Sequence, residues 1–591
     1  MSSVTIESLL KSVQRPGRYV DGEWNAIRKD WSDVEATTVV VYPDLYEIGM
    51  SSPELQDIYH LLNADRRVLC ERAFNPWSDM AAAMRQRGIP LYSLESRRSL
   101  RTFDFVLMVI GRELGYANVL ESLDLAGIPV KASERQESDP LVLGLGARLK
   151  NPEPLAGVFD LFALGDPDAG IRDVLDLYLR VKGPAAGRPG RDEFLALAAT
   201  TPGVYVPACF QTDYDAAGAV ASVTPACRHV PGHVRLQVSP GLGPPLTSPV
   251  VPYLEVVDDR GFVEVQRDCG GSCRGCRAGS GCAVLRQRGV EAVVDAVDAL
   301  VQRCGYREIG LLAPAGADYG LLMDIARAVR AKYPVGELSL VLPPLQLPHD
   351  GDPDQALASA EMAFSMGWSG VRYRWTLGRP GPGGDGVPGL MELVARTQEM
   401  GRRILGRKPK IRVEGSYHGP RPHTSTERSA VMLPVEELQR IHAGVRKELR
   451  KLGAHLSAPD PEAAVIEAAL AMGDRRAGDV VHQAWTMGCT DDGRSRQLDA
   501  AGWTEAFQKA GLDADFYVRR PRSEAEVLPW SHIEPPDAGE APTAERGARA
   551  DECAAKPCPV CRYLDDGRLL GLASRKAVAS RGDQSDESVR E

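Results

Sequence analysis

Long apolar runs are missing from this chain of 591 residues. No stretch approaches the roughly 20 apolar residues that a membrane-spanning helix needs. The first residues, 1–7, also lack the basic and then apolar order of a secretory signal peptide. We therefore expect a cytoplasmic protein without membrane spans.

An excess of positive charge is also lacking, because 80 Asp and Glu residues outnumber 70 Lys and Arg residues and give a net charge of -10. Such a chain has no general attraction for a phosphate backbone, so a nucleic-acid ligand would need a local basic patch. Two basic runs, residues 402–408 and 446–451, lie in helix-like patterns, for which a solvated helix face is the simpler interpretation. The apolar and charged fractions, 43% and 25%, are typical of globular proteins.

Cysteine is too scarce for a disulfide scaffold, with 12 residues in the whole chain, yet six of them fall into two tight clusters. The central cluster, Cys269, Cys273 and Cys276, has the spacing C-x3-C-x2-C and follows a strand-like run at 261–265. Three thiolates on one Gly-rich loop can hold three irons of a [4Fe-4S] cluster and leave the fourth iron open. Zinc is the alternative, but zinc sites usually show paired C-x2-C knuckles with four ligands.

A second cluster lies near the end of the sequence. Cys553, Cys558 and Cys561 have the spacing C-x4-C-x2-C and follow a linker rich in Pro, Ala, Glu and Arg. Three ligands can hold an auxiliary iron-sulfur cluster or a zinc ion if a fourth comes from elsewhere, such as Cys489. The spacing alone does not distinguish an iron-sulfur cluster from zinc at this site.

Apolar patterns with the periods of strands and helices alternate along most of the chain. Strands are predicted at 37–42, 103–110, 140–144 and 160–165, with helices between them, which indicates a parallel doubly wound sheet with ligand sites at the carboxyl ends of its strands. After the central cysteines, the predicted strands are 308–312, 338–342, 370–375 and 410–414, again alternating with helices. The sequence therefore predicts an α/β protein.

The central cysteine spacing resembles that of the radical S-adenosylmethionine (SAM) superfamily. The phrases at 43–50, 90–96 and 151–154 narrow the resemblance to radical SAM proteins with an amino-terminal cobalamin-binding-like domain. The resemblance implies a Rossmann-like doubly wound domain, a partial (β/α)6 radical SAM barrel and a small helical carboxyl-terminal extension. The implied units are an arm at 1–35, a cobalamin-binding-like domain at 36–185, a connector at 186–250, the barrel at 251–453, the extension at 454–535, and a linker with a Cys-containing tail at 536–591.

The resemblance also implies site residues. Ala313, Pro314 and Ala315 stand where the superfamily receives the SAM amino group, and Arg374 is placed to pair with the SAM carboxylate. The residues implied for cobalamin are Tyr46, Gly49, Met50 and Gly111. The cobalamin motif D-x-H-x-x-G is absent and His60 does not match it, so a bound cobalamin is expected without a histidine ligand.

The function implied is reductive cleavage of SAM to a 5'-deoxyadenosyl radical that functionalises an unactivated carbon, with methyl transfer from cobalamin as one outcome. A ferredoxin or flavodoxin would supply the electron. One alternative is a radical SAM enzyme that modifies RNA. Another is a degenerate, non-catalytic iron-sulfur protein, since Gly275 replaces the aromatic residue usual before the third cysteine. The substrate is not encoded in any linear motif.

Overall fold

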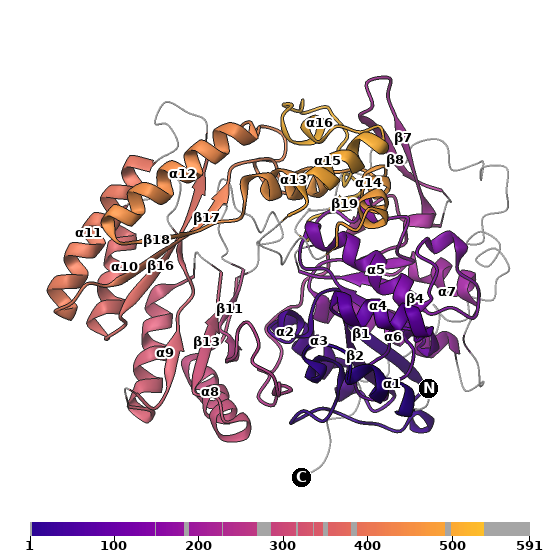
Figure 1. The fold of residues 1–591 in the computed structure, drawn as a ribbon, viewed down its shortest axis with the longest axis horizontal. Coiled ribbons are helices and arrows are strands. Elements are labelled where there is room, and N and C mark those ends of the chain that lie inside the picture. Colours follow the sequence, from indigo (N-terminus) through magenta and orange to yellow (C-terminus); the bar gives the residue numbers. More distant parts are fainter. Residues whose placement is uncertain are drawn as a thin grey trace, which may run out of the picture.

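The computed structural model describes residues 3–147, 149–182, 188, 190–226, 229–268, 285–314, 317–334, 336–346, 353–379, 387–490 and 498–536. Strands and helices alternate in both halves, so the predicted α/β class is confirmed. Figure 1 shows an amino-terminal lobe in indigo and purple, a second lobe in pink and orange, and a yellow group of helices that bridges them. Within the described ranges no helix is both long and apolar enough to cross a membrane.

The amino-terminal lobe is built on a six-stranded sheet in the order β2-β1-β3-β4-β5-β6. The first five strands in this order are parallel, and β6 runs antiparallel to β5. The order reverses between β1 and β3, and the carboxyl edge at such a point is where open α/β sheets bind ligands. The strands are β1 (Ala36–Tyr42), β2 (Val68–Phe74), β3 (Phe105–Val109), β4 (Leu141–Leu145), β5 (Leu161–Ala163) and β6 (Val204–Tyr205).

Helices cover both faces of this sheet (Figure 1), which explains why its strands are buried along almost their whole length. They are α1 (Ser3–Leu10), α2 (Tyr46–Gly49), α3 (Pro53–Ala64), α4 (Ser78–Arg87), α5 (Tyr116–Ala126), α6 (Pro167–Lys182) and α7 (Arg191–Ala198). A hairpin of β7 (Phe210–Tyr214) and β8 (Val220–Pro225) follows the sheet.

Strand β2 was not predicted, because its sequence VLCERAF carries two charges and does not alternate. Both charged side chains are buried, and each has remote partners. Arg72 pairs with Glu23 and Glu95 at 2.7 Å each. Glu71 accepts hydrogen bonds from the Trp31 indole (3.1 Å) and from Ser96 Oγ (2.6 Å). Because these partners are distant in sequence, residues 68–74 carry no local pattern that predicts a strand.

The second lobe contains two parallel sheets. β10 (Gly261–Glu264), β13 (Glu308–Leu312) and β14 (Ser339–Val341) form the first, in that order. The second has the order β15 (Leu345–Gln346), β16 (Gly370–Leu377), β17 (Lys410–Tyr417), β18 (His455–Ser457). Only residues 342–344 separate β14 from β15. The helices between strands are α8 (Val290–Cys304), α9 (Tyr319–Lys332), α10 (Pro353–Ser365), α11 (Val387–Leu405) and α12 (Val435–Leu452).

Alternate residues of the second sheet face the helices. Figure 1 shows α10 and α11 on the side of β16 away from the amino-terminal lobe. Tyr373 is fully buried on that side, where its hydroxyl bonds Thr397 of α11 at 2.8 Å. Arg372 and Arg374 therefore project from the opposite face of the strand.

The chain then returns to the amino-terminal lobe. The helices are α13 (Pro461–Ala471), α14 (Ala477–Thr486), α15 (Ala500–Lys509) and α16 (Ala514–Val518). A short strand, β19 (Ile533–Glu534), pairs in parallel with β9 (Val234–Arg235). The Trp485 indole donates to Glu121 Oε2 of α5 at 3.0 Å. These contacts hold the final helices against the first sheet.

Candidate functional site

The ends of the central cysteine segment are held together by a small hairpin. After β10 the chain enters β11 (Gln266–Arg267), which pairs antiparallel with β12 (Arg286–Gln287). Cys269, Cys273 and Cys276 lie between these strands, at 269–284, outside the described residues. The hairpin fixes both ends of this segment at the carboxyl end of the first parallel strand of the second lobe.

Two arginines anchor the hairpin to the amino-terminal lobe. Arg286, whose side chain is only 3% exposed, forms ion pairs with Asp166 and Asp268 and donates to the Ser239 carbonyl at 2.9 Å. Arg267 donates to Glu264 Oε1 at 2.7 Å and reaches across to Asp168 Oδ1 at 3.0 Å. Asp166 and Asp168 lie shortly after β5, so residues at the carboxyl edge of the first sheet hold the two ends of the cysteine segment in place.

Gln266 links the hairpin to the next turn of the lobe. Its amide donates to the Asp268 carbonyl at 2.8 Å, and its oxygen accepts from Gln287 Nε2 at 2.9 Å and from Asp318 N at 3.4 Å. The neighbouring Val265 N–H donates to the Leu312 carbonyl at 2.8 Å. The turn after β13 is therefore held directly beside the base of the cysteine segment.

The predicted SAM residues Ala313 and Pro314 lie in that turn, and Ala315 lies outside the described residues. Asp318, the first carboxylate after them, is the N-cap of α9 and accepts from the backbone N–H groups of Gly320 and Leu321. Its carboxylate is thus used to cap the helix. The turn offers its backbone carbonyls rather than an acidic side chain.

Asp57 of α3 is an acid that sequence analysis missed. Asp57 itself is exposed at the surface, but the surrounding protein shields its carboxyl from water, which disfavours the charged form. The carboxylates of Glu264 and Asp168 disfavour that charge further. Together these effects raise its pKa to about 7, although Arg267 opposes them. Asp166 and Asp168 could have been found from sequence, because they stand at the end of a predicted strand, where such sheets bind ligands. Asp57 lies within a helix and carries no such signal.

Arg374 is half exposed on the face of β16 away from the helices. Its guanidinium lies 3.7 Å from Glu414 Oε2 of β17, which also pairs with Arg372 at 3.3 Å. Arg372 in addition donates to the Leu342 carbonyl at 2.6 Å. Arg374 therefore has the looser ion pair of the two and is the guanidinium better able to bind another carboxylate.

Residues 54–207 match the family described as "Radical SAM proteins, N-terminal". The match spans α3 to the end of β6 and supports a place for this chain among radical SAM proteins. No curated protein matches the chain. A crystal structure of N-acetylneuraminate lyase from Mycoplasma synoviae aligns over 46% of this chain and 95% of its own, with 12% identity and a TM-score of 0.17.

Three of the residues predicted to hold cobalamin are buried in the amino-terminal lobe, just before the matched residues 54–207. The Tyr46 hydroxyl donates to Glu23 at 2.7 Å, and Met50 Sδ contacts Arg72 at 3.3 Å. Gly49 packs against Phe74 so closely that an added Cβ would lie 2.3 Å from the ring. These residues take part in packing around the buried Arg72, and none of them offers a surface at the strand ends.

Gly111 has a different environment. It follows β3 and is half-buried beside the Tyr42 hydroxyl, 3.0 Å from where a Cβ would lie. Next to it, Glu113 has a raised pKa, because burial and the nearby carboxylate of Glu467 disfavour its charge. This strand end presents groups toward the final helices, since Arg112 pairs with Glu467 of α13 at 2.6 Å.

The phrase at 151–154 lies at the joint between the amino-terminal lobe and the final helices. Asn151 donates to the carbonyls of Ala471 and Gly473 at 2.9 and 2.7 Å. The fully buried Glu153 accepts from Arg475 Nε at 2.7 Å and also from the Tyr205 hydroxyl. Residues more than 300 positions apart in sequence thus form one buried network.

Two histidines of this joint are neutral at physiological pH. Burial lowers the pKa of His423 to about 4 and that of His532 to about 3. His423 lies 3.1 Å from the Lys150 carbonyl, while His532 packs on the Tyr205 ring with centroids 4.8 Å apart. Their surroundings indicate a structural role.

The tail cysteines Cys553, Cys558 and Cys561 lie outside the described residues. Cys489, their suggested fourth partner, is buried at the end of α14, with its Sγ 3.8 Å from Asp499 Oδ2. Groups of three or more His, Cys, Asp or Glu side chains suited to a metal are absent from the described part of the chain.

Proposed function

We propose that this protein is a radical SAM enzyme whose [4Fe-4S] cluster is held by Cys269, Cys273 and Cys276. The proposal rests on one observation. The strands that flank the C-x3-C-x2-C segment form a hairpin, and Arg286 holds this hairpin at the carboxyl end of β10. Barrel-type folds keep their reactive groups at that end of their strands. The match of residues 54–207 to the radical SAM N-terminal family supports the same chemistry.

The donor set fits the cluster. Three thiolates within eight residues suit three irons and leave the fourth open for SAM. When bound, such a cluster delivers one electron to SAM and makes a carbon-centred radical available. The protein contributes binding, orientation and exclusion of water.

The described residues have separate positioning roles in this proposal. Arg286 and Arg267 hold the ends of the cysteine segment, and Gln266 fixes that base against the turn at 312–318. Backbone carbonyls of that turn would accept the SAM amino group. Arg374 would bind the SAM carboxylate, because an arginine fork matches a carboxylate bidentately.

Cobalamin fits the described residues poorly. Tyr46, Gly49 and Met50 are enclosed, so a corrin would have to rest on other strand-end residues around Gly111. We therefore derive no step through cobalamin. Methyl transfer stays a separate proposal that rests on the strand order β2-β1-β3-β4-β5 and on the half-exposed end of β3.

Anaerobic reconstitution tests the proposal. The wild-type protein should bind about four irons at the central site and, with a strong reductant, convert SAM to 5'-deoxyadenosine. The triple variant C269A/C273A/C276A should lose this iron, while C304A, which removes a half-buried cysteine beside Asn25, should keep it. Full iron retention in the triple variant would refute the cluster assignment.

Two further outcomes separate the alternatives. A bound cluster without SAM cleavage would indicate the degenerate iron-sulfur protein. Protein loaded with cobalamin should retain it through desalting as a base-off species, unchanged in H60A, if methyl transfer is the reaction. Loss of all cobalamin while SAM cleavage persists would leave a cobalamin-independent radical enzyme.

A further inference from the structure

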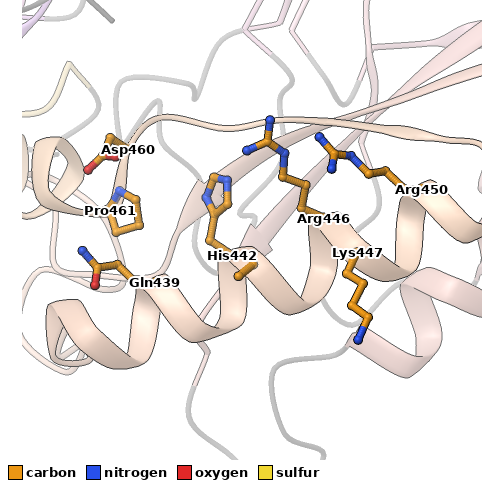
Figure 2. Close-up of a pocket in the computed structure, with 8 residues that line it drawn as sticks. Gln439, His442, Arg446, Lys447, Arg450, Asp460 and Pro461 are labelled. Carbon is orange, nitrogen blue, oxygen red and sulfur yellow. The ribbon is translucent and has the colours of Figure 1, made fainter. Parts of the chain in front are cut away.

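A groove outside the candidate SAM site runs along α12. It has a volume of about 570 Å³ and lies between α12 and the start of α13 (Figure 2). His442, Arg446, Lys447 and Arg450 line it from the helix, and Asp460 lines it from the opposite side. This volume is within the usual range for sites that bind small molecules.

Three of the basic side chains at this groove share one side of the helix, while Figure 2 shows Lys447 pointing to the opposite side. His442, Arg446 and Arg450 are four residues apart, and Figure 2 shows their side chains on the same side of α12. A rise of 1.5 Å per residue spreads the row over about 12 Å. Like charges four residues apart destabilise a helix, so such a row needs a compensating partner.

No described carboxylate forms an ion pair with Arg446, Lys447 or Arg450. The nearest acid of the helix, Glu448, pairs with Lys451 at 2.7 Å, and Lys451 does not line the groove. Asp460 caps α13 by accepting from the Glu462 N–H at 2.9 Å. Arg446 and Arg450 thus share the groove with one carboxylate that is already engaged.

His442 lies at the amino-terminal end of this row. Its Nδ1 lies 2.5 Å from the Tyr417 hydroxyl at the end of β17. Burial and the charge of Arg446 lower its pKa, and the opposing effect of Asp460 does not cancel them. The positive charge of the groove therefore comes from the arginines, and His442 is its neutral member.

One lysine of the second basic run lies near the carboxyl end of α12. Helices α11 and α12 pack together, and Lys408 approaches the end of α12 so closely that a Cβ on Gly453 would lie 1.8 Å from its Nζ. Lys408 belongs to the basic run at 402–408. Arg403 of the same run instead pairs with Glu361 of α10 at 3.7 Å, so this run does not line the groove.

We propose that the α12 groove binds the phosphate groups of a nucleotide-containing ligand. Two guanidinium groups about 6 Å apart along the helix match adjacent phosphates better than a single carboxylate. The single acceptor, Asp460, suits the hydroxyl or amino donors that such a ligand also carries. The phosphates belong either to a free nucleotide or to an RNA strand, and the two probes of the test distinguish these sources.

The test measures binding to the full-length protein, without SAM or reductant, so it is independent of the iron-sulfur chemistry. The two probes are tripolyphosphate and a single-stranded RNA of about 12 nucleotides. The variant is R446Q/R450Q, and the matched control is R440Q/K451Q, which removes the same charge from residues of α12 that do not line the groove. Gln preserves helix propensity, and circular dichroism checks the fold.

We expect R446Q/R450Q to weaken binding of at least one probe by about tenfold for each cation removed, while the control stays close to wild type. For RNA, the slope of log K against log salt should fall by about 1.4. RNA binding alone would identify a strand as the ligand, and tripolyphosphate binding alone a free nucleotide. Binding of neither probe, or equal weakening in the control, would overturn the proposal.

Discussion

Buried charges in the amino-terminal lobe are stable because each has partners fixed around it. Arg72 is fully buried between Glu23 and Glu95, and its guanidinium also lies over the Tyr59 ring at 5.1 Å. Removing one partner of such a set typically costs about 3–5 kcal/mol, since the remaining charge is left uncompensated. Asp57 differs, because shielding of its carboxyl from water by the surrounding protein, and then the carboxylates of Glu264 and Asp168, raise its pKa against the opposing effect of Arg267.

The stability of the protein should therefore depend on pH through Asp57. Its pKa rises from 3.8 in the unfolded chain to about 7 in the folded one, so the folded state binds the additional proton between these values. Stability then falls as pH rises from about 4 to 7. D57N should raise the melting temperature above pH 7 and leave it unchanged near pH 4. The increase in melting temperature should be smaller than the full pKa shift implies, because Asp57 is solvent-exposed and water screens its interactions.

Thermal unfolding across pH 4 to 8 checks this expectation. D173N, at an exposed position of α6, is the matched control and should follow the wild-type curve. A difference between D57N and wild type that does not change with pH would contradict the assignment.

At the scale of elements, the candidate site depends on the hairpin β11–β12. Its strands are two residues each, too short to be stable alone, so the ion pairs of Arg286 to Asp166 after β5 and of Arg267 to Asp168 in the first turn of α6 must hold it. The first sheet thus sets the position of a segment that belongs to the second lobe.

Loss of that anchor should loosen the cluster without unfolding the protein. In R286Q, Asp166 and Asp268 lose their shared partner. We expect iron affinity to fall about 10- to 100-fold, as is usual when groups that orient metal ligands are removed. Iron retained after desalting against a chelator measures the effect. R260Q, at the amino end of β10, removes an arginine paired with Asp258 and Glu308 and should retain iron normally. Equal retention in R286Q and wild type would show that the anchor is dispensable.

At the scale of the whole molecule, the last described residues close the fold. β19 pairs with β9, and the Trp530 indole donates to Glu427 at 3.2 Å, so the chain up to Glu534 is part of the structure. The tail cysteines come after this point in the sequence.

Truncation after Pro536 should therefore leave the fold and the central iron intact and remove only metal bound by Cys553, Cys558 and Cys561. Metal analysis of the truncated protein checks this. The full-length variant C553A/C558A/C561A is the matched control and should lose the same amount. Unchanged iron and zinc in both proteins would show that the tail cysteines bind no metal.

The sequence by itself determined the features that depend on near neighbours. The alternation of strands and helices, most element positions and the two cysteine clusters follow from periodicity and spacing over a few residues. The same reasoning could have identified Asp166 and Asp168, because they follow a predicted strand.

Only the tertiary structure decided the features that join distant residues. Strand β2 is stable because Arg72 pairs with Glu23 and Glu95, the hairpin is anchored by Asp166 more than 100 residues before it, and the groove forms where α12 meets the start of α13. The enclosed position of Tyr46 has the same origin, since Glu23 of the arm accepts its hydrogen bond. The charge and burial of a side chain are set by whichever groups surround it in space, and a linear motif does not contain that information.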